Sequence, residues 1–88
     1  MKEKTWRQMI TEELKENKET WNDIVSITLT DEELDKEFDP GYGSREGQPF
    51  TAWTKRRVYF PVTYDGAEWV ASVSRKPNGK PTEHVGGG

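Results

Sequence analysis

A short turn signal in the second half of the chain restricts the fold more than any other feature. The pair Asp65-Gly66 joins two runs rich in β-branched and aromatic residues, 58–64 and 67–74. A type I′ turn needs positive φ at both central residues, and Asp-Gly is a preferred pair for it. Closing a hairpin there pairs apolar residues on one face: Val58 with Val73, Phe60 with Ala71, and Val62 with Trp69. We therefore predict an antiparallel hairpin whose apolar face belongs to the core.

Two further segments before the hairpin are strand-like. Residues 50–54 complete a three-stranded meander with the hairpin, and residues 26–30 alternate as a short strand would. Pro61 lies inside the middle strand of the meander and cannot donate a ladder hydrogen bond. The strand at 50–54 must therefore stop short of Pro61, or Pro61 lies on an open edge.

The first half of the chain favours helix. Thr5 and Gln8 have the spacing of a capping box, and Trp6, Ile10 and Leu14 recur every four residues, which predicts a helix over 6–17. Capping signatures at Thr20 and Thr30 predict two short helical turns. The predicted class is α+β, with the N-terminal helix and the short helical turns packed on the apolar face of a small antiparallel three-stranded meander.

The 88 residues allow one domain with one modest core. We expect that domain to span 1–76, because residues 77–88 are rich in Pro and Gly and predict an irregular, flexible tail. The four Trp residues supply much of the apolar area. Trp6, Trp21 and Trp69 are expected inside, whereas Trp53 lies next to basic residues and is either packed or partly exposed.

The sequence does not favour catalysis. The chain has no Cys, which excludes a thiolate zinc site, a disulfide and a Cys nucleophile. Its single His, His84, lies in the tail, away from any partner that could orient it. The acidic run 31–39 lacks the ligand spacing of an EF-hand loop, and the Gly-rich run 41–47 leads into a strand rather than a helix. We expect no enzyme activity, no cofactor and no metal.

Charge is divided unevenly along the chain and indicates two candidate binding surfaces. Residues 1–39 contain six Lys or Arg and twelve Asp or Glu, whereas residues 40–88 contain seven and four. The hairpin register brings the basic run 55–57 close to Arg75 and Lys76. The candidate partner-binding residues are Lys55, Arg56, Arg57, Tyr42 and Trp53 on the basic side, and Asp31, Glu32, Asp35 and Glu37 on the acidic side.

Several runs of the sequence resemble small uncharacterised proteins of tailed phages and prophages. The runs are Thr20-Trp21-Asn22-Asp23-Ile24-Val25, Leu29-Thr30-Asp31-Glu32-Glu33-Leu34, Pro49-Phe50-Thr51-Ala52-Trp53-Thr54, Val58-Tyr59-Phe60-Pro61 and Tyr64-Asp65-Gly66-Ala67-Glu68-Trp69-Val70. The likeness covers nearly the whole chain. The resemblance implies no activity and no site residues. It implies only a phage context, in which small proteins bind and redirect host proteins.

These observations predict a non-enzymatic phage or prophage protein that binds and modulates a host protein, by analogy with anti-CRISPR and other counter-defence inhibitors. The alternative is a small nucleic-acid-binding accessory protein that uses the basic edge of the hairpin. No apolar run approaches the roughly 20 residues of a membrane helix, so we expect no membrane partner and a location in the host cytoplasm. The sequence leaves open whether the chain is a monomer or a homodimer.

Overall fold

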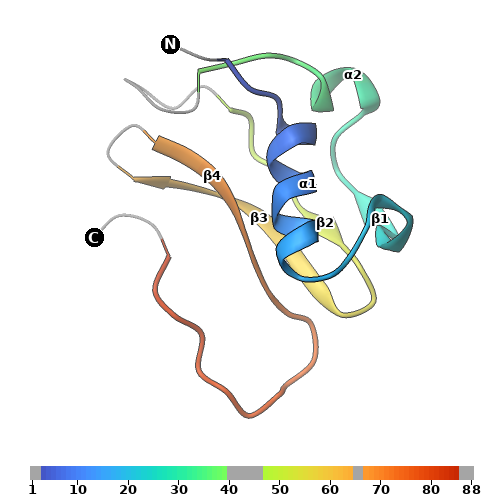
Figure 1. Cartoon of the computed structure of the whole chain (residues 1–88), viewed down its shortest axis with the longest axis vertical. Helices are drawn as coiled ribbons and strands as arrows, with labels where there is room; N and C mark the ends of the chain where they lie inside the picture. Colours follow the sequence, from blue (N-terminus) through green and yellow to red (C-terminus); the bar gives the residue numbers. More distant parts are fainter. Residues whose placement is uncertain (1–2, 40–46, 65–66, 86–88) are drawn as a thin grey trace.

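The computed structural model describes residues 3–39, 47–64 and 67–85 of the chain. Helix α1 (Trp6–Glu16) lies over one face of a sheet (Figure 1), so the predicted α+β class is confirmed. The other elements, in chain order, are the 3₁₀ turn η1 (Trp21–Asp23), strand β1 (Ser26–Ile27), helix α2 (Asp31–Leu34), and strands β2 (Ala52–Trp53), β3 (Arg57–Tyr64) and β4 (Ala67–Ser74).

Helix α1 begins where the capping box predicts and ends one residue before the expected limit. The Thr5 hydroxyl accepts a hydrogen bond from the Gln8 amide (3.1 Å), and the Gln8 side chain accepts one from the Thr5 amide (2.9 Å). This reciprocal pair satisfies two of the amides that a helix start leaves open. The buried side chains of α1 are Trp6, Met9, Ile10 and Leu14, which form its predicted apolar stripe.

The sheet has four antiparallel strands in the order β1-β2-β3-β4, so the predicted three-stranded meander was wrong by one strand. The additional strand is β1, in which Ser26 and Ile27 pair with Trp53 and Ala52. Its alternation is visible in the sequence. However, a strand of two residues is too short for its alternation of side chains to predict which strand it pairs with.

The predicted register of the hairpin is confirmed. Strands β3 and β4 pair Val58 with Val73 and Val62 with Trp69, while the Asp65-Gly66 turn itself lies outside the described residues. Strand β2 pairs only with the first part of β3, through residues 58 and 59, and stops short of Pro61. The proline nitrogen therefore points toward the β2 side of β3, at a position beyond the end of β2, where no hydrogen-bond donor is needed.

Helix α1 covers the opposite face of the hairpin from the one that the apolar pattern predicts. Ala52 and Tyr59 are fully buried in the core with the α1 side chains, together with Val70. The prediction failed because it counted apolar side chains and ignored hydrogen bonding. The hydroxyl groups on this face can be buried because they have partners: Tyr59 donates to Glu19 and Ser72 accepts from Asn17.

Trp6 occupies the centre of the core. Its ring lies 4.9 Å, centroid to centroid, from the rings of both Phe38 and Phe50, and its indole Nε1 donates to the Gln48 carbonyl at 3.1 Å. Gly47 packs directly against this cluster, because a Cβ atom there would lie 2.5 Å from the Trp6 ring. Only glycine lets the backbone approach so closely.

The chain beyond β4 carries neither helix nor strand through residue 85, and every residue from 77 to 85 is exposed. In Figure 1 this segment bends round after β4 and runs back beside it. We call residues 75–85 the C-terminal segment. Within the described ranges, no helix has the length and apolar character needed to cross a membrane.

Candidate binding surfaces

The basic residues expected at one end of the hairpin do lie together. The Thr54 hydroxyl accepts hydrogen bonds from the amides of Arg56 and Arg57 (3.2 and 2.9 Å), which fixes the turn between β2 and β3. The amide of Arg75 donates to the Arg56 carbonyl at 2.8 Å, so the end of β4 is held against this turn. We define the basic end as the four exposed cations Lys55, Arg56, Arg75 and Lys76.

Arg57 points away from the basic end and is used within the fold. It faces the α1 side of the sheet, where its guanidinium donates to the hydroxyl and the carbonyl of Ser72 at 2.9 and 3.2 Å. Ser72 also accepts a hydrogen bond from Asn17 and donates one to Glu13. Arg57 thus links the sheet to the end of α1, and of the three basic residues at 55–57 only the first two are exposed.

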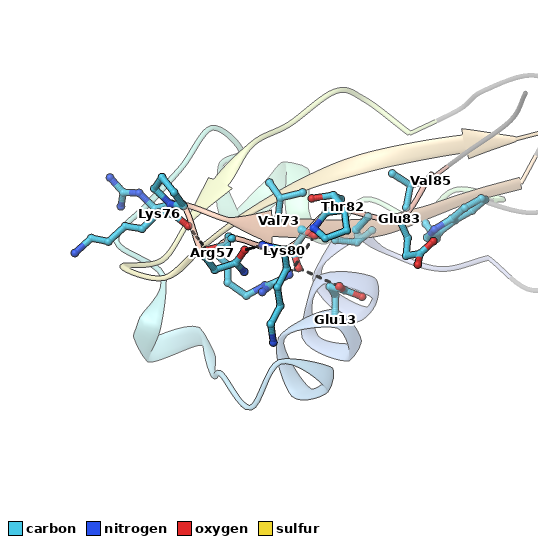
Figure 2. Close-up of a pocket in the computed structure, with 18 residues that line it drawn as sticks. Glu13, Arg57, Val73, Lys76, Lys80, Thr82, Glu83 and Val85 are labelled. Atoms are coloured by element: carbon cyan, nitrogen blue, oxygen red, sulfur yellow. Dashed lines mark hydrogen bonds between the residues drawn. The ribbon is translucent and has the colours of Figure 1, made fainter.

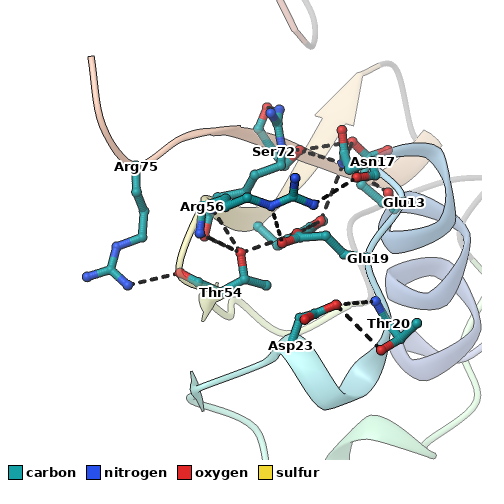
Figure 3. A network of polar contacts seen from close by, with 11 residues as sticks. Glu13, Asn17, Glu19, Thr20, Asp23, Thr54, Arg56, Ser72 and Arg75 are labelled. Carbon is teal, nitrogen blue, oxygen red and sulfur yellow. Dashed lines mark hydrogen bonds and ion pairs between the residues drawn. The ribbon is translucent and has the colours of Figure 1, made fainter. Parts of the chain in front are cut away.

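A buried carboxyl group lies beneath the basic end (Figure 3). Glu19 is 4% exposed and accepts hydrogen bonds from the Tyr59 hydroxyl at 2.5 Å and the Thr54 hydroxyl at 3.2 Å. Its second oxygen pairs with the Arg56 guanidinium at 3.3 Å. In the described part of the chain, no buried side-chain nitrogen or oxygen lacks a partner. No pattern in the sequence signals this network, which positions Arg56 by anchoring one side of its guanidinium.

The Tyr59 phenol is expected to make stability depend on alkaline pH. Burial, and secondarily the hydrogen bond to Glu19, raise the pKa of Tyr59 well above its usual range. Above about pH 10 the unfolded chain releases this proton and the folded chain keeps it, so the free energy of unfolding falls as pH rises, by about 1.4 kcal/mol per pH unit. We expect Tyr59→Phe to lack this contribution.

Urea denaturation at about pH 9 and about pH 11 measures the effect. The wild-type chain should lose more stability between the two values than Tyr59→Phe, although the variant starts from a lower stability. Other titrating groups are common to both chains and cancel in the comparison. Equal losses in the two chains would contradict the assignment.

The acidic candidates near α2 differ in whether they pair with Arg7. Arg7 pairs with Asp35 at 2.6 Å and with Asp31 at 3.3 Å, and the Arg7 hydrogen bond lowers the pKa of Asp35. Arg7 also lies 5.5 Å from the centre of the Trp21 ring, a cation–π distance. Two of the four candidates, Asp31 and Asp35, therefore pair with Arg7 at the surface. All four carboxylates are exposed, and the two that do not pair with Arg7 are Glu32 and Glu37.

The face of the sheet opposite α1 is apolar and only partly covered. Trp69 is 36% exposed and Tyr64 52% exposed. The strand alternation and register place both on this face. Trp53 pairs with Val58 and lies half-buried at the margin next to the basic end. We define the outer face as Trp53, Val58, Phe60, Val62, Tyr64, Trp69, Ala71 and Val73.

Sequence reasoning identified the residues of the outer face but assigned them to the core. Trp69 was expected inside and is partly exposed; Trp6 is buried as expected, and Trp21 is half-buried. The signal for an exposed apolar surface was present, because one helix stripe cannot cover both faces of a sheet. The sequence pattern did not show which face of the sheet α1 covers, because that choice depends on hydrogen-bond partners distant in sequence.

The other candidates carry little chemistry. Tyr42 lies outside the described residues, and His84 is exposed in the C-terminal segment. Within residues 3–39, 47–64 and 67–85, no three His, Asp or Glu side chains are grouped so that they could hold a metal ion.

Comparisons with protein-family models, curated proteins and solved structures gave no match to this chain.

Proposed function

We propose that this chain is a non-enzymatic binding module that binds another protein through the outer face of its sheet. One observation carries the proposal: the outer face includes two partly exposed aromatic side chains, Trp69 and Tyr64, next to the buried Val62 and Ala71. Apolar patches rimmed by polar residues are typical of interaction sites. Trp and Tyr are also among the residues that contribute most to binding energy.

The basic end gives this surface a charged margin. Lys55 and Lys76 are exposed and form no ion pair with another described residue, and Trp53, two residues before Lys55, pairs with Val58 of the outer face. Cations at the rim of an interface accelerate association with an acidic partner. The resemblance to phage proteins would make that partner a protein of the bacterial host, whose activity binding would modulate.

Nucleic-acid binding is the alternative that the basic end supports. Tyr59, the aromatic residue expected to accompany the cations, is fully buried and donates its hydroxyl to Glu19. It therefore cannot stack on a base, and Trp53 is the aromatic residue that remains beside the cations. Direct titration with single-stranded DNA and RNA separates this alternative from a protein partner.

Replacing the two exposed aromatics of the outer face should abolish partner binding and leave the fold intact. We expect Trp69→Ser/Tyr64→Ser to weaken affinity for a purified partner by at least about 30-fold, because each hot-spot truncation typically costs about 1–2 kcal/mol or more. The partner is first recovered by capture from nuclease-treated bacterial lysate and identified by mass spectrometry. Affinity is then measured by calorimetry with both purified proteins.

Val25→Ser provides the matched control. Val25 is 56% exposed and lies outside the strand pairs that define the outer face. The control should bind as the wild type does. Unchanged affinity in the double variant would overturn the proposal, as would binding to single-stranded DNA or RNA in direct titration when the nuclease-treated lysate yields no protein.

A further inference from the structure

A groove separates β4 from the C-terminal segment. It has a volume of about 1060 Å³, and its walls are residues 69–74 of β4 on one side and residues 75–83 and 85 on the other, with Glu13 of α1 at its base. Figure 2 shows side chains from both walls directed into this space. Six consecutive residues of β4, 69–74, line the groove, so it extends along the strand.

Strand β4 presents an unpaired edge to this groove, because it is the last strand of the sheet. The hydrogen bond from the Arg75 amide to the Arg56 carbonyl sets the alternation along β3 and β4 and makes Pro61 and Val70 a non-hydrogen-bonded pair, which suits a residue without an N–H. Alternation then directs the backbone N–H and C=O groups of Val70, Ser72 and Ser74 away from β3. Of these, the Ser72 carbonyl already accepts one hydrogen bond from the Arg57 guanidinium and has a second lone pair for another. No backbone hydrogen bond joins residues 77–85 to β4 in the part of the chain that the structure describes.

The side chains that line the groove differ between its two sides. In Figure 2, Arg57, Lys80 and Glu13 lie on one side of β4, and Val73 and Val85 lie on the other. Over the whole lining, cations outnumber acids. The cations are Arg57, Arg75, Lys76 and Lys80, and the acids are Glu13 and Glu83. A ligand that alternates acidic and apolar groups along its length would complement both sides.

We propose that this groove binds an extended acidic peptide segment, which pairs with β4 as an additional strand of the sheet. Outward N–H and C=O groups at strand spacing match another peptide backbone, and the net positive lining favours acidic side chains. A nucleic acid offers no such backbone match, and Glu13 and Glu83 oppose its phosphates. A second copy of the chain would have to bring a whole sheet edge and its own C-terminal segment into the groove.

This inference goes beyond the function proposed above, since it concerns the backbone edge of β4 rather than the side chains of the outer face, although Trp69, Ala71 and Val73 belong to both surfaces. The two can fail separately. Loss of partner binding in Trp69→Ser/Tyr64→Ser tests the aromatic side chains, whereas the experiment below uses a peptide probe on the unsubstituted chain and reads the edge amides of β4 directly.

The probe is a capped peptide of eight residues, the length of β4, in which Glu and Val alternate. We expect it to slow hydrogen exchange at the amides of Val70, Ser72 and Ser74 by about ten-fold or more, because these amides gain acceptors on pairing. The amides of Ala71 and Val73 already pair with β3 and serve as internal controls. The same peptide, N-methylated at the alternate residues whose amides would face β4, should give no protection.

Charge reversal tests the side-chain contribution. Lys76→Glu/Lys80→Glu should weaken peptide binding at least about five-fold, as expected when complementary charges are replaced by like ones. The matched control is Lys15→Glu/Lys36→Glu, which changes net charge equally at exposed positions outside the groove. Equal weakening by both pairs would reduce the effect to net charge and overturn the assignment of the cations.

Three other outcomes would overturn the proposal itself. The first is unchanged exchange at the edge amides, or equal protection by the N-methylated peptide. The second is protection by single-stranded DNA and not by the peptide. The third is protection that appears without peptide and grows with protein concentration, which would identify a second copy of the chain as the occupant.

Discussion

Replacing Trp6 with alanine is expected to remove a large part of the stability of the protein. Trp6 is 2% exposed and contacts the rings of Phe38 and Phe50, so truncation leaves a cavity that neighbouring side chains cannot fill. Substitutions of this kind cost about 3–5 kcal/mol. A domain of this length has a total stability of only roughly 4–13 kcal/mol. The backbone near Gln48 also loses the indole hydrogen bond.

Chemical denaturation followed by circular dichroism measures this loss, and the chain itself supplies a matched control. Trp69→Ala removes the same side chain from a partly exposed position on the outer face, so its cost should be smaller by about 2 kcal/mol or more. If both substitutions cost the same, the core would not be centred on Trp6 and the two faces of the sheet would be wrongly assigned.

The local elements could be predicted from sequence because their determinants are close together in the chain. Thr5 and Gln8 are three residues apart and specify the start of α1. The hairpin register follows from a two-residue turn and from the alternation around it. In each case the interacting groups are fixed by the helical or strand repeat, so no information about distant segments is needed.

The choice of sheet face could not be predicted in the same way. The apolar pattern ranks Val58, Phe60 and Val62 above Tyr59, which carries a hydroxyl. The structure nevertheless buries Tyr59 fully, because Glu19, forty residues away, accepts that hydroxyl. Hydrogen bonds between groups so far apart in sequence leave no periodic signal, and a polar face with partners can replace an apolar one as the core.

The same limit applies to the candidate site. Lys55 and Arg56 were placed correctly at an exposed turn, since the register alone brings 55–57 near the end of β4. The neighbouring Arg57 has the same residue type as Arg56 but faces the opposite way, toward Ser72. Whether a charged residue serves a partner or the fold depends on side-chain direction and on acceptors contributed by other strands, which residue type does not reveal.

The buried carboxyl group of Glu19 leads to the second large expected effect. Glu19→Leu should lower the free energy of unfolding by about 2–5 kcal/mol, because it leaves the Tyr59 hydroxyl without its acceptor and removes one acceptor of Thr54. Arg56 contributes less to the loss, since its side chain is 65% exposed and water can solvate it. Glu19→Gln retains an acceptor oxygen and should cost about 1–2 kcal/mol.

A double variant distinguishes this hydrogen-bond effect from simple misfit of leucine. Tyr59→Phe removes the hydroxyl that Glu19→Leu leaves unpaired. The double variant should therefore lose about 1–2 kcal/mol less free energy of unfolding than the sum of the two single losses. Glu16→Leu, at an exposed position in the last turn of α1, is the matched control and should change stability little. Strict additivity of Glu19→Leu and Tyr59→Phe would contradict the direct contact. Glu19 also pairs with Arg56 in the basic end. Glu19→Gln should therefore reduce partner affinity only if Arg56 contributes to the interface. That result would link the buried hydrogen-bond network to the binding surface above it.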